Sequence, residues 1–374
     1  MGKEIGNFWG AFADGAILFP LIATLSSSSG YSSTVLFFTA GVLYILAGLY
    51  FKIPMPVQPL KAISVAAVVN GASFTEVRLA GALIGLFCLG LLFFHVEKFS
   101  NRIPTFLIHG IQLGLGCMLI RKAIDSGIPL FYHPLDHVSL VILMAVVASL
   151  IASKITSFST LGLLAAMAAL FAISQNPISS SNSHFIDDNT VRWNLILTLV
   201  LPQIILTMAN SVIATPDAAK RYFGDKASKV TLRSLLTSLG IGNILMSLIG
   251  GLPFCHGSGG MTAHVRGGSY HGRSNFYIGL FLIVLSAIQY FSKHIVLVYP
   301  PLFLCVLLGT VGFYHLQLAK PSWNDSNARV ELIAMGATAF LTQNLIDSLL
   351  AGVIIAFAKP LFFARKVSNH DLLS

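Results

Sequence analysis

Apolar segments follow one another along almost the whole chain, separated by short polar or Gly- and Pro-containing stretches. A bilayer core of about 30 Å requires about 20 apolar residues per helical crossing. Stretches such as 140–151 and 295–311 are apolar on nearly all sides, unlike the alternating strands of an outer-membrane barrel. The pattern predicts an all-α polytopic membrane protein with about fourteen segments, at residues 8–25, 33–51, 57–70, 77–94, 103–120, 137–152, 158–174, 192–213, 230–250, 258–266, 275–291, 296–312, 329–341 and 346–363.

The third and tenth of these segments are too short to cross a bilayer. Each follows a broken stretch, IPMPVQPLKA before the third and GGLPFCHGSGG before the tenth. Proline and glycine exclude a regular helix through these stretches, and extended backbone is tolerated at membrane depth only inside protein or beside a wet cavity. We therefore expect two half-helices, beginning near Pro59 and Ser258, with Ser258 as the N-cap of the second.

The polar stretch SQNPISSSNSHFIDDNTVRW divides the chain into halves in which the two short segments hold corresponding positions. Matching prolines precede the short segments and open the fifth and twelfth segments: Pro54 with Pro253, and Pro104 with Pro301. An odd number of crossings per half makes the second half insert upside down. The sequence thus predicts inverted repeats of seven segments each, at residues 1–176 and 187–374.

Composition and charge agree with a membrane protein. The chain is 55% hydrophobic and only 10% charged, with a mean hydropathy of +0.80, too few charges for a water-exposed surface. The net charge of +9 does not indicate nucleic acid binding, because the basic residues are scattered between apolar segments. With the N-terminus inside, most Lys and Arg fall on the cytoplasmic face, so both termini are expected there, in a bacterial inner membrane. The four cysteines have no metal or redox spacing, so neither a metal nor a cofactor is expected.

The two half-helix ends are the candidate site. A helix N-terminus presents free N–H groups and the positive end of its dipole, which suit a small oxyanion. Gln58, Lys61 and Ser258 are candidate side-chain donors. Lys61 either neutralises the anion or pairs with Asp14, and Asp14 either carries a coupled proton or cation or caps a break in the first helix. The competing interpretation is that small residues here only ease helix packing.

The eighth segment adds polar groups to this site. Gln203, Thr207 and Asn210 lie at helical spacing on one side, where they either line the cavity or join helices. The eighth and tenth segments contain no Asp or Glu. That absence favours an anion carrier over a nucleobase permease, which is expected to hydrogen-bond its ligand with a carboxylate there.

A membrane hydrolase is the alternative from another class, because His256 and His264 flank Ser258. The G-x-S-x-G context fails, since residue 256 is not glycine. We therefore expect no catalytic residues. The remaining histidines are expected mostly at interfaces or in loops, where water solvates them.

The motifs PMPVQPLKA, NSVIAT and PFCHGSGGMTAHVRGG resemble those of the molybdate transporters that form a branch of the sulfate permease (SulP) superfamily. The resemblance covers nearly the whole chain. It implies the fold shared by sulfate and uracil permeases, with a core domain of segments one to four and eight to eleven moving against a gate domain. It also implies secondary-active transport by alternating access, of molybdate or alternatively sulfate, and a homodimer. The end at Ser374 without a cytoplasmic STAS domain fits the molybdate branch.

The resemblance carries the family's site positions over by motif; all but His256 are expected to bind substrate, and His256, like Asp14, is expected to have a coupling or structural role. The positions are Gln58, Pro59 and Lys61 in the third segment, Asn210 in the eighth, and His256, Gly257, Ser258, Gly259 and Gly260 in the tenth. Two departures stand out. The family's Gly-Asp-Leu-Gly-Thr in the first segment is here Ala13-Asp14-Gly15-Ala16-Ile17, without the Thr hydroxyl, and RGGSYHGRSN after the tenth segment is longer than the family pattern.

Overall fold

The computed structural model describes residues 2–94, 104–128, 190–292, 301–326 and 328–370. The described elements of the first half are α1 Gly2–Ala11, the 3-10 turn η1 Phe12–Asp14, α2 Gly15–Ser29, α3 Ser33–Phe51, β1 Gln58–Pro59, α4 Lys61–Asn70, α5 Phe74–Leu91 and α7 Thr105–Gly127. Those of the second half are α10 Trp193–Leu206, the π-helix η3 Thr207–Ile213, α11 Ala214–Phe223, the 3-10 turn η4 Gly224–Ala227, α12 Leu232–Ile249, β2 Phe254–Cys255, α13 Ser258–Arg266, α14 Arg273–Phe291, α15 Pro301–Leu318, α16 Lys320–Trp323, α17 Arg329–Thr342 and α18 Leu345–His370.

The predicted segments that lie in the described ranges are all helical, and the third and tenth are the short helices α4 and α13. The sixth and seventh predicted segments, and the boundary between the predicted repeats, lie outside the described residues. Seven described stretches are long and apolar enough to cross a membrane: Glu4–Ser26, Ser33–Phe51, Phe74–Leu91, Thr105–Gly127, Trp193–Ala227, Leu232–Ile249 and Arg273–Phe291. The polytopic helical fold is therefore confirmed.

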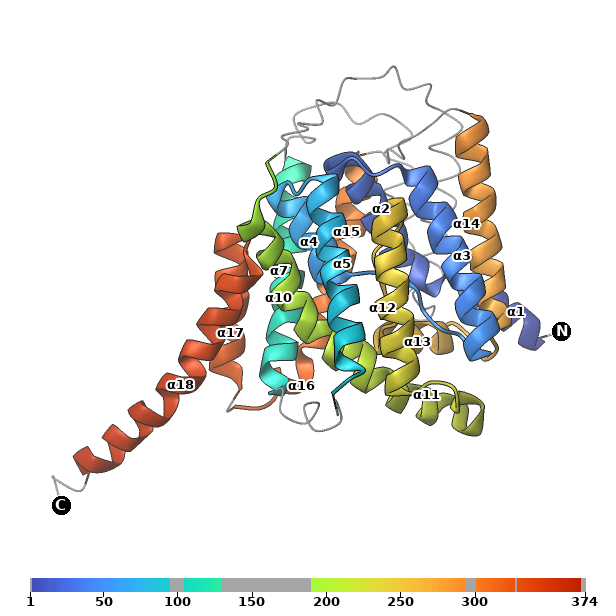
Figure 1. The fold of residues 1–374 in the computed structure, drawn as a ribbon. Coiled ribbons are helices and arrows are strands. Elements are labelled where there is room, and N and C mark those ends of the chain that lie inside the picture. Colours follow the sequence, from blue (N-terminus) through green and yellow to red (C-terminus); the bar gives the residue numbers. More distant parts are fainter. Residues whose placement is uncertain (1, 95–103, 129–189, 293–300, 327, 371–374) are drawn as a thin grey trace.

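Glycines set the contacts between the long helices, which stand side by side in Figure 1. A Cβ on Gly41 of α3 would lie 2.7 Å from the carbonyl oxygen of Gly279 on α14, and one on Gly85 of α5 would lie 2.8 Å from that of Gly240 on α12. Small residues let helix backbones approach this closely in membranes. The second segment thus packs on the eleventh and the fourth on the ninth, the pairing that a two-fold relation between the halves generates.

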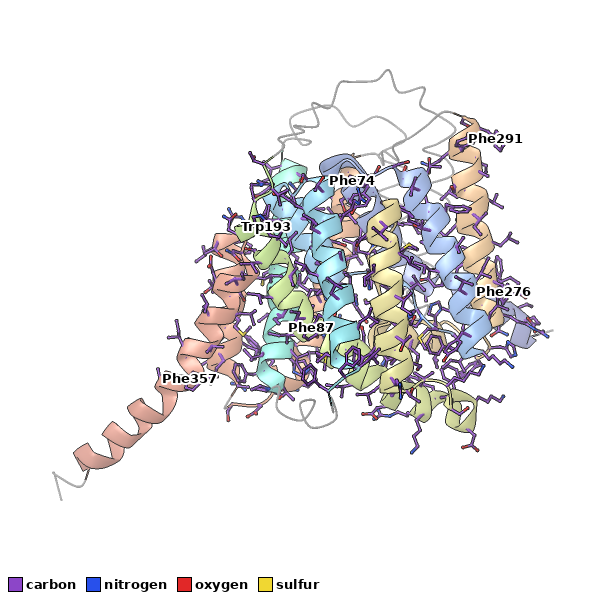
Figure 2. All side chains as sticks on the ribbon, viewed as in Figure 1. Phe74, Phe87, Trp193, Phe276, Phe291 and Phe357 are labelled. Carbon is purple, nitrogen blue, oxygen red and sulfur yellow. The ribbon has the colours of Figure 1, made fainter. Side chains whose placement is uncertain are left out.

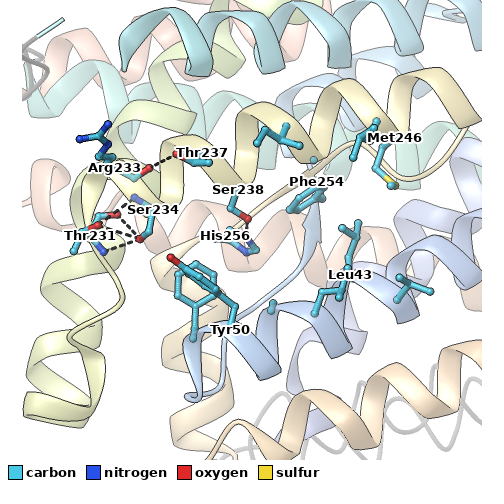
Figure 3. Close-up of a pocket in the computed structure, with 17 residues that line it drawn as sticks. Leu43, Tyr50, Thr231, Arg233, Ser234, Thr237, Ser238, Met246, Phe254 and His256 are labelled. Carbon is cyan, nitrogen blue, oxygen red and sulfur yellow. Dashed lines mark hydrogen bonds between the residues drawn. The ribbon is translucent and has the colours of Figure 1, made fainter. Parts of the chain in front are cut away.

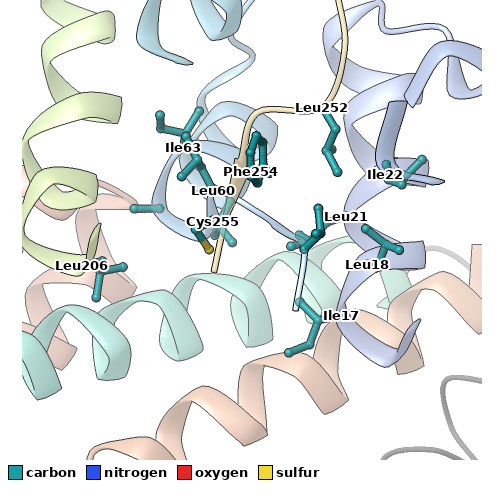
Figure 4. Packing of buried hydrophobic residues seen from close by; sticks show 14 of the residues in the cluster. Ile17, Leu18, Leu21, Ile22, Leu60, Ile63, Leu206, Leu252, Phe254 and Cys255 are labelled. Atoms are coloured by element: carbon teal, nitrogen blue, oxygen red, sulfur yellow. The ribbon is translucent and has the colours of Figure 1, made fainter. Parts of the chain in front are cut away.

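The first segment lies at the centre of the molecule. Of the most apolar part of Glu4–Ser26, 89% is buried inside the protein, against 39% for the corresponding parts of Phe74–Leu91 and Leu232–Ile249. Leu18, Leu21 and Ile22 of α2 pack among residues that flank the broken stretches, such as Leu60 and Leu252 (Figure 4). The outer helices instead expose large apolar side chains, as expected where lipid is the solvent (Figure 2).

The two broken stretches meet as an antiparallel pair of short strands. Gln58 is paired with Cys255 and Pro59 with Phe254. Asn243 of α12 holds β2 from the side, because its Nδ2 donates to the Phe254 carbonyl at 2.9 Å and its Oδ1 accepts from the Phe254 amide at 2.8 Å. Extended backbone inside the membrane region is thereby hydrogen-bonded within the protein, as the bilayer requires. The pair places the first turns of α4 and α13 beside each other.

Candidate functional site

The first turn of α4 presents unused amides. Leu60 is the N-cap with an extended backbone, and no side chain caps the helix. The Leu60 amide donates to the Pro253 carbonyl, and the Ala62 amide donates to Gln203 Oε1, both at 2.9 Å. Among the described residues, the amides of Lys61 and Ile63 have no acceptor. Two N–H groups at this end are therefore available to a ligand.

The first turn of α13 is open in the same way. Gly257, not Ser258, is the N-cap, so the prediction of a Ser258 cap is wrong. The Ser258 hydroxyl instead donates to Asn210 Oδ1 at 2.7 Å, because η3 carries Asn210 alongside. In the described part of the chain, the amides of Ser258, Gly259 and Gly260 have no acceptor. These amides and those of α4 form a set of five donors at two adjoining helix ends.

Lys61 lies in this set without a counter-ion. Its side chain is buried, and within the described ranges it has neither an ion pair nor a hydrogen bond. The predicted alternative of a pair with Asp14 is not formed, because other groups occupy both oxygens of Asp14. A buried ammonium is costly unless a negative group joins it. The positive charge of Lys61 is therefore not balanced by a protein group in the described ranges.

Asp14 is the centre of a separate buried cluster. Its Oδ1 accepts from Gln58 Nε2 at 2.6 Å, and its Oδ2 accepts from Tyr44 Oη at 2.8 Å and faces His264 Nε2 at 2.9 Å. Asp14 makes no side-chain cap bond to α2, so the predicted capping role is wrong. The other ring nitrogen of His264 faces the Gly10 carbonyl at 2.8 Å. A carbonyl only accepts, so Nδ1 donates to Gly10, and Nε2 is the ring nitrogen that faces the carboxylate.

Gln58 joins the Asp14 cluster to the helix ends. Because its Nε2 is committed to Asp14, its Oε1 is turned away, and this atom is buried without a partner. An unpartnered buried carbonyl oxygen costs free energy, about 1–3 kcal/mol. The predicted Gln58 donor is thus occupied in this structure, and the free atom of the amide is an acceptor.

The polar residues of the eighth segment divide into two groups. Gln203 and Thr207 hydrogen-bond to each other at 3.0 Å, and Gln203 also accepts from α4, so both side chains support the half-helix. Asn210 lies in the π-helix, a distortion frequent at functional sites. Its Oδ1 is taken by Ser258, and its Nδ2 has no acceptor among the described residues. Asn210 therefore has the free donor of this segment.

His256 supports the strand pair. Its Nδ1 donates to the Pro56 carbonyl at 2.7 Å, and its Nε2 accepts from the Ser238 hydroxyl at 2.9 Å. Phe51 and Phe254 pack edge-on against its ring. Ser258 donates to Asn210, so Ser258 and His256 do not form the nucleophile and base pair that a hydrolase uses.

Glycine is required at two positions of the α13 turn. A Cβ on Gly260 would lie 2.7 Å from Asp14 Oδ1 and 2.8 Å from Gln58 Nε2, and one on Gly257 would lie 2.8 Å from Asn210 Nδ2. A Cβ on Gly259 would meet only Tyr314 Oη of α15, at 3.0 Å. Gly259 therefore faces α15, which closes the site on that side.

A cavity of about 630 Å³ lies elsewhere, between α3 and α12 (Figure 3). Apolar side chains such as Leu43, Leu46 and Leu245 form most of its wall, and His256 lies at its inner end. Neither Lys61 nor Ser258 lines it. Its outer residues are exposed along the lipid-facing side of the two helices, so this groove is distinct from the paired helix ends.

Several site residues were missed by sequence reasoning. His315 is 1% exposed, so the expectation that the remaining histidines lie mostly at interfaces or in loops fails for this residue, and His264 was considered only for the hydrolase alternative. Tyr44 and Tyr314 were not singled out either. The only signal for His264 was its spacing six residues after Ser258, which puts it on the far turn of α13.

This geometry defines a class, the polytopic membrane carriers with crossed half-helices. Two solved structures share the fold. The transmembrane domain of a cyanobacterial bicarbonate transporter, BicA, aligns with a TM-score of 0.59 at 16% identity, over 94% of this chain and 97% of that one. The murine solute carrier 26 family member A9 anion transporter, in the inward-facing state, aligns with a TM-score of 0.65 at 13% identity, over 96% of this chain and 68% of that one.

Sequence comparison gives the family. The family model described as "Molybdate transporter of MFS superfamily" matches residues 6–119 and 195–314, and the chain belongs to that family. Molybdate transporter 2 of Arabidopsis thaliana is 25% identical, over 87% of this chain and 80% of the relative. Molybdate transporter 1 of the same plant is 23% identical, over 76% and 73%. The resemblance to molybdate transporters is thus confirmed, and the fold is shared with these two solved anion transporters.

Proposed function

We propose that this protein carries a tetrahedral oxyanion, molybdate, across the membrane by alternating access, and binds it between the first turns of α4 and α13. Membership of the molybdate transporter family and the names of its relatives support the substrate. The observation that carries the site is the set of five free amides beside the unpaired Lys61 ammonium. Amides at helix N-termini and a nearby cation hold a dianion without a protein carboxylate in contact.

The remaining site residues take supporting roles in this proposal. Asn210 Nδ2 adds a side-chain donor, and the Ser258 hydroxyl orients Asn210. Gln203 and Thr207 position α4 rather than touch the anion. Pro59 ends the strand before the half-helix, and His256 fixes the crossing of the two strands. Gly257, Gly259 and Gly260 keep the amides of α13 accessible.

The proposal includes a coupled proton at Asp14. As the structure stands, Gln58 turns its acceptor away from Asp14, and an oxyanion needs a donor there. A proton on Asp14 Oδ1 would donate to Gln58 Oε1 once the amide turns over, which frees Nε2 to donate to the anion. The titratable groups that act on Asp14 from neighbouring elements are Tyr44, Lys61, Cys255, His264 and Tyr314. Calorimetric titration with molybdate in two buffers of different ionisation enthalpy measures the proton taken up, and an equal heat in both would refute this coupling.

The same proposal includes the architecture of the moving parts. The pairing of α3 with α14 and of α5 with α12 supports inverted repeats at 1–176 and 187–374, and α7 and α15 belong to the gate. The asymmetric placement of Lys and Arg supports cytoplasmic termini. A bacterial inner membrane and a homodimer stay predictions.

Uptake of labelled molybdate into liposomes holding the purified protein tests the function, with sulfate and uracil as competitors. We expect molybdate to compete best, whereas stronger competition by sulfate would assign sulfate as the substrate. Gln58→Ala, Ser258→Ala and Gly259→Val should each weaken uptake, because they remove a polar group or fill the space before the amides. Thr198→Ala is a matched control, since its exposed hydroxyl bonds only to the Asn194 carbonyl. Normal uptake by all three site variants would refute the site.

A further inference from the structure

His315 is a buried histidine without a hydrogen bond. It lies in the last turn of α15 and is 1% exposed, and neither Nδ1 nor Nε2 has a partner among the described residues. A neutral imidazole always carries one N–H donor and one acceptor, and a dry interior penalises both when they are left unused. The side chain therefore has unmet hydrogen-bonding capacity at a site closed to bulk water.

The other buried histidines in the described part of the chain do have hydrogen-bond partners. His256 and His264 each hydrogen-bond through both ring nitrogens. His109, half-buried on the neighbouring helix α7, hydrogen-bonds to the Ser322 hydroxyl. The fold thus provides partners for the histidines that it uses structurally, and His315 differs from them.

The position of α15 brings His315 toward the paired helix ends. The preceding residue, Tyr314, places its hydroxyl 3.0 Å from where a Cβ on Gly259 would lie. The Lys61 ammonium is close enough to act electrostatically on the His315 ring. On the gate side, α15 packs against α7, where a Cβ on Gly116 would lie 2.7 Å from the Gly312 carbonyl oxygen.

A second unpartnered group lies on the neighbouring helix. Gly309 faces Ala123, and Gly116 faces Gly312 and Leu316, so α7 and α15 run antiparallel. Gln112 of α7 therefore lies about one turn from the level of His315, and its Oε1 is also buried without a partner. Unused polar atoms thus occur on both helices of this pair.

We propose that His315 binds the transported oxyanion from the gate side, donating from a ring nitrogen to an anion oxygen opposite Lys61. This inference rests on the function proposed above. The Lys61 ammonium has no negative partner, and the His315 imidazole has an N–H without an acceptor. An oxyanion between them would accept from both. The half-helix residues hold the anion from one domain, and His315 adds a contact from the other. Such a contact forms only when the gate helices lie against the core.

Affinity and stability measured together test this role. In His315→Leu we expect molybdate to bind about tenfold more weakly by calorimetry, because a hydrogen bond to a charged group is lost. We also expect the ligand-free melting temperature to stay equal or to rise, because an apolar side chain replaces an unpartnered polar one. His315→Gln, which keeps a donor, should retain most of the affinity. His109→Leu is the matched control and should leave the affinity unchanged.

Two results would overturn the inference. Wild-type affinity in His315→Leu, while Gln58→Ala binds weakly, would place His315 outside the site and leave the proposed function standing. A lower melting temperature in His315→Leu, together with weak binding in His315→Gln, would show a structural role. If the wild-type protein binds neither molybdate nor sulfate, the proposed function fails first, and this inference fails with it.

Discussion

Replacement of Asp14 by alanine tests the buried cluster that joins α1, α3, β1 and α13. The carboxylate accepts from Tyr44, Gln58 and His264 in a region without water access. Asp14→Ala removes all three contacts at once and leaves three buried polar groups without this partner. Tyr44 and Gln58 lose their hydrogen bonds to the carboxylate, which are 2.8 Å and 2.6 Å long.

The size of the loss follows from burial. Removal of one partner of a buried charged pair costs about 3–5 kcal/mol, since the other charge stays buried. Glu4 offers the same chemistry on the surface, where its carboxylate lies 2.7 Å from Arg273 Nη1 and the two side chains are 48% and 63% exposed. An exposed pair contributes about 0–1 kcal/mol. Glu4→Ala should therefore leave the free energy of unfolding nearly unchanged.

The free energies are compared by denaturant titration of the purified protein in mixed micelles. Equal losses in Asp14→Ala and Glu4→Ala would refute the reasoning, because burial would then have no effect. Asp14→Asn separates charge from shape. Its amide can still accept from Gln58 and can donate toward His264 Nε2, so most of the stability should return while the coupled proton is lost. A variant as unstable as Asp14→Ala would show that the charge itself is required.

Three further losses of unfolding free energy are expected in the same titration. Gly260→Ala should cost about 2 kcal/mol, because its Cβ would lie 2.7 Å from Asp14 Oδ1, whereas Gly90→Ala, with open space around the Cβ, should be near neutral. Glu76→Ala should cost about 2–3 kcal/mol, since this buried carboxylate holds an arginine and the cap of α5, whereas Asp125→Ala in an exposed pair should cost under about 0.5 kcal/mol. Asn243→Ala should cost about 2 kcal/mol by freeing both backbone groups of one β2 residue. If Gly90→Ala and Asp125→Ala lose as much unfolding free energy as the buried variants, these predictions are contradicted.

The half-helices were predictable because their cause is local. Pro54, Pro56 and Pro253 exclude a helix whatever surrounds them, and a segment of ten residues cannot cross a bilayer. The pairing of the two breaks was also accessible, since both fell in corresponding positions of the two halves. Local chemistry and length together therefore sufficed for the helical fold and for the two short helices that follow the broken stretches.

The partners of the site residues were not predictable, because they are set by packing between distant elements. The bonds of Asp14 come from α3, β1 and α13, and no spacing in the sequence links these. Ser258 has the right residue type for an N-cap, but Asn210 lies close enough to take its hydroxyl instead. His315 lay beyond the predicted end of its segment at residue 312, and α15 continues to Leu318.

Buried polar atoms without a hydrogen-bond partner lower the stability of this fold. Nine buried side-chain atoms lack a hydrogen bond among the described residues, and five of them belong to Gln58, Ser64, Gln112 and His315. These residues come from β1, α4, α7 and α15, and α7 contacts both α4 and α15. Buried polar atoms in proteins are almost always hydrogen-bonded, because each one left without a partner costs free energy. Their concentration in these four elements lowers the stability of this part of the interior. In the proposed site the oxyanion accepts from His315, so we expect binding to stabilise the contact of α15 with the half-helices.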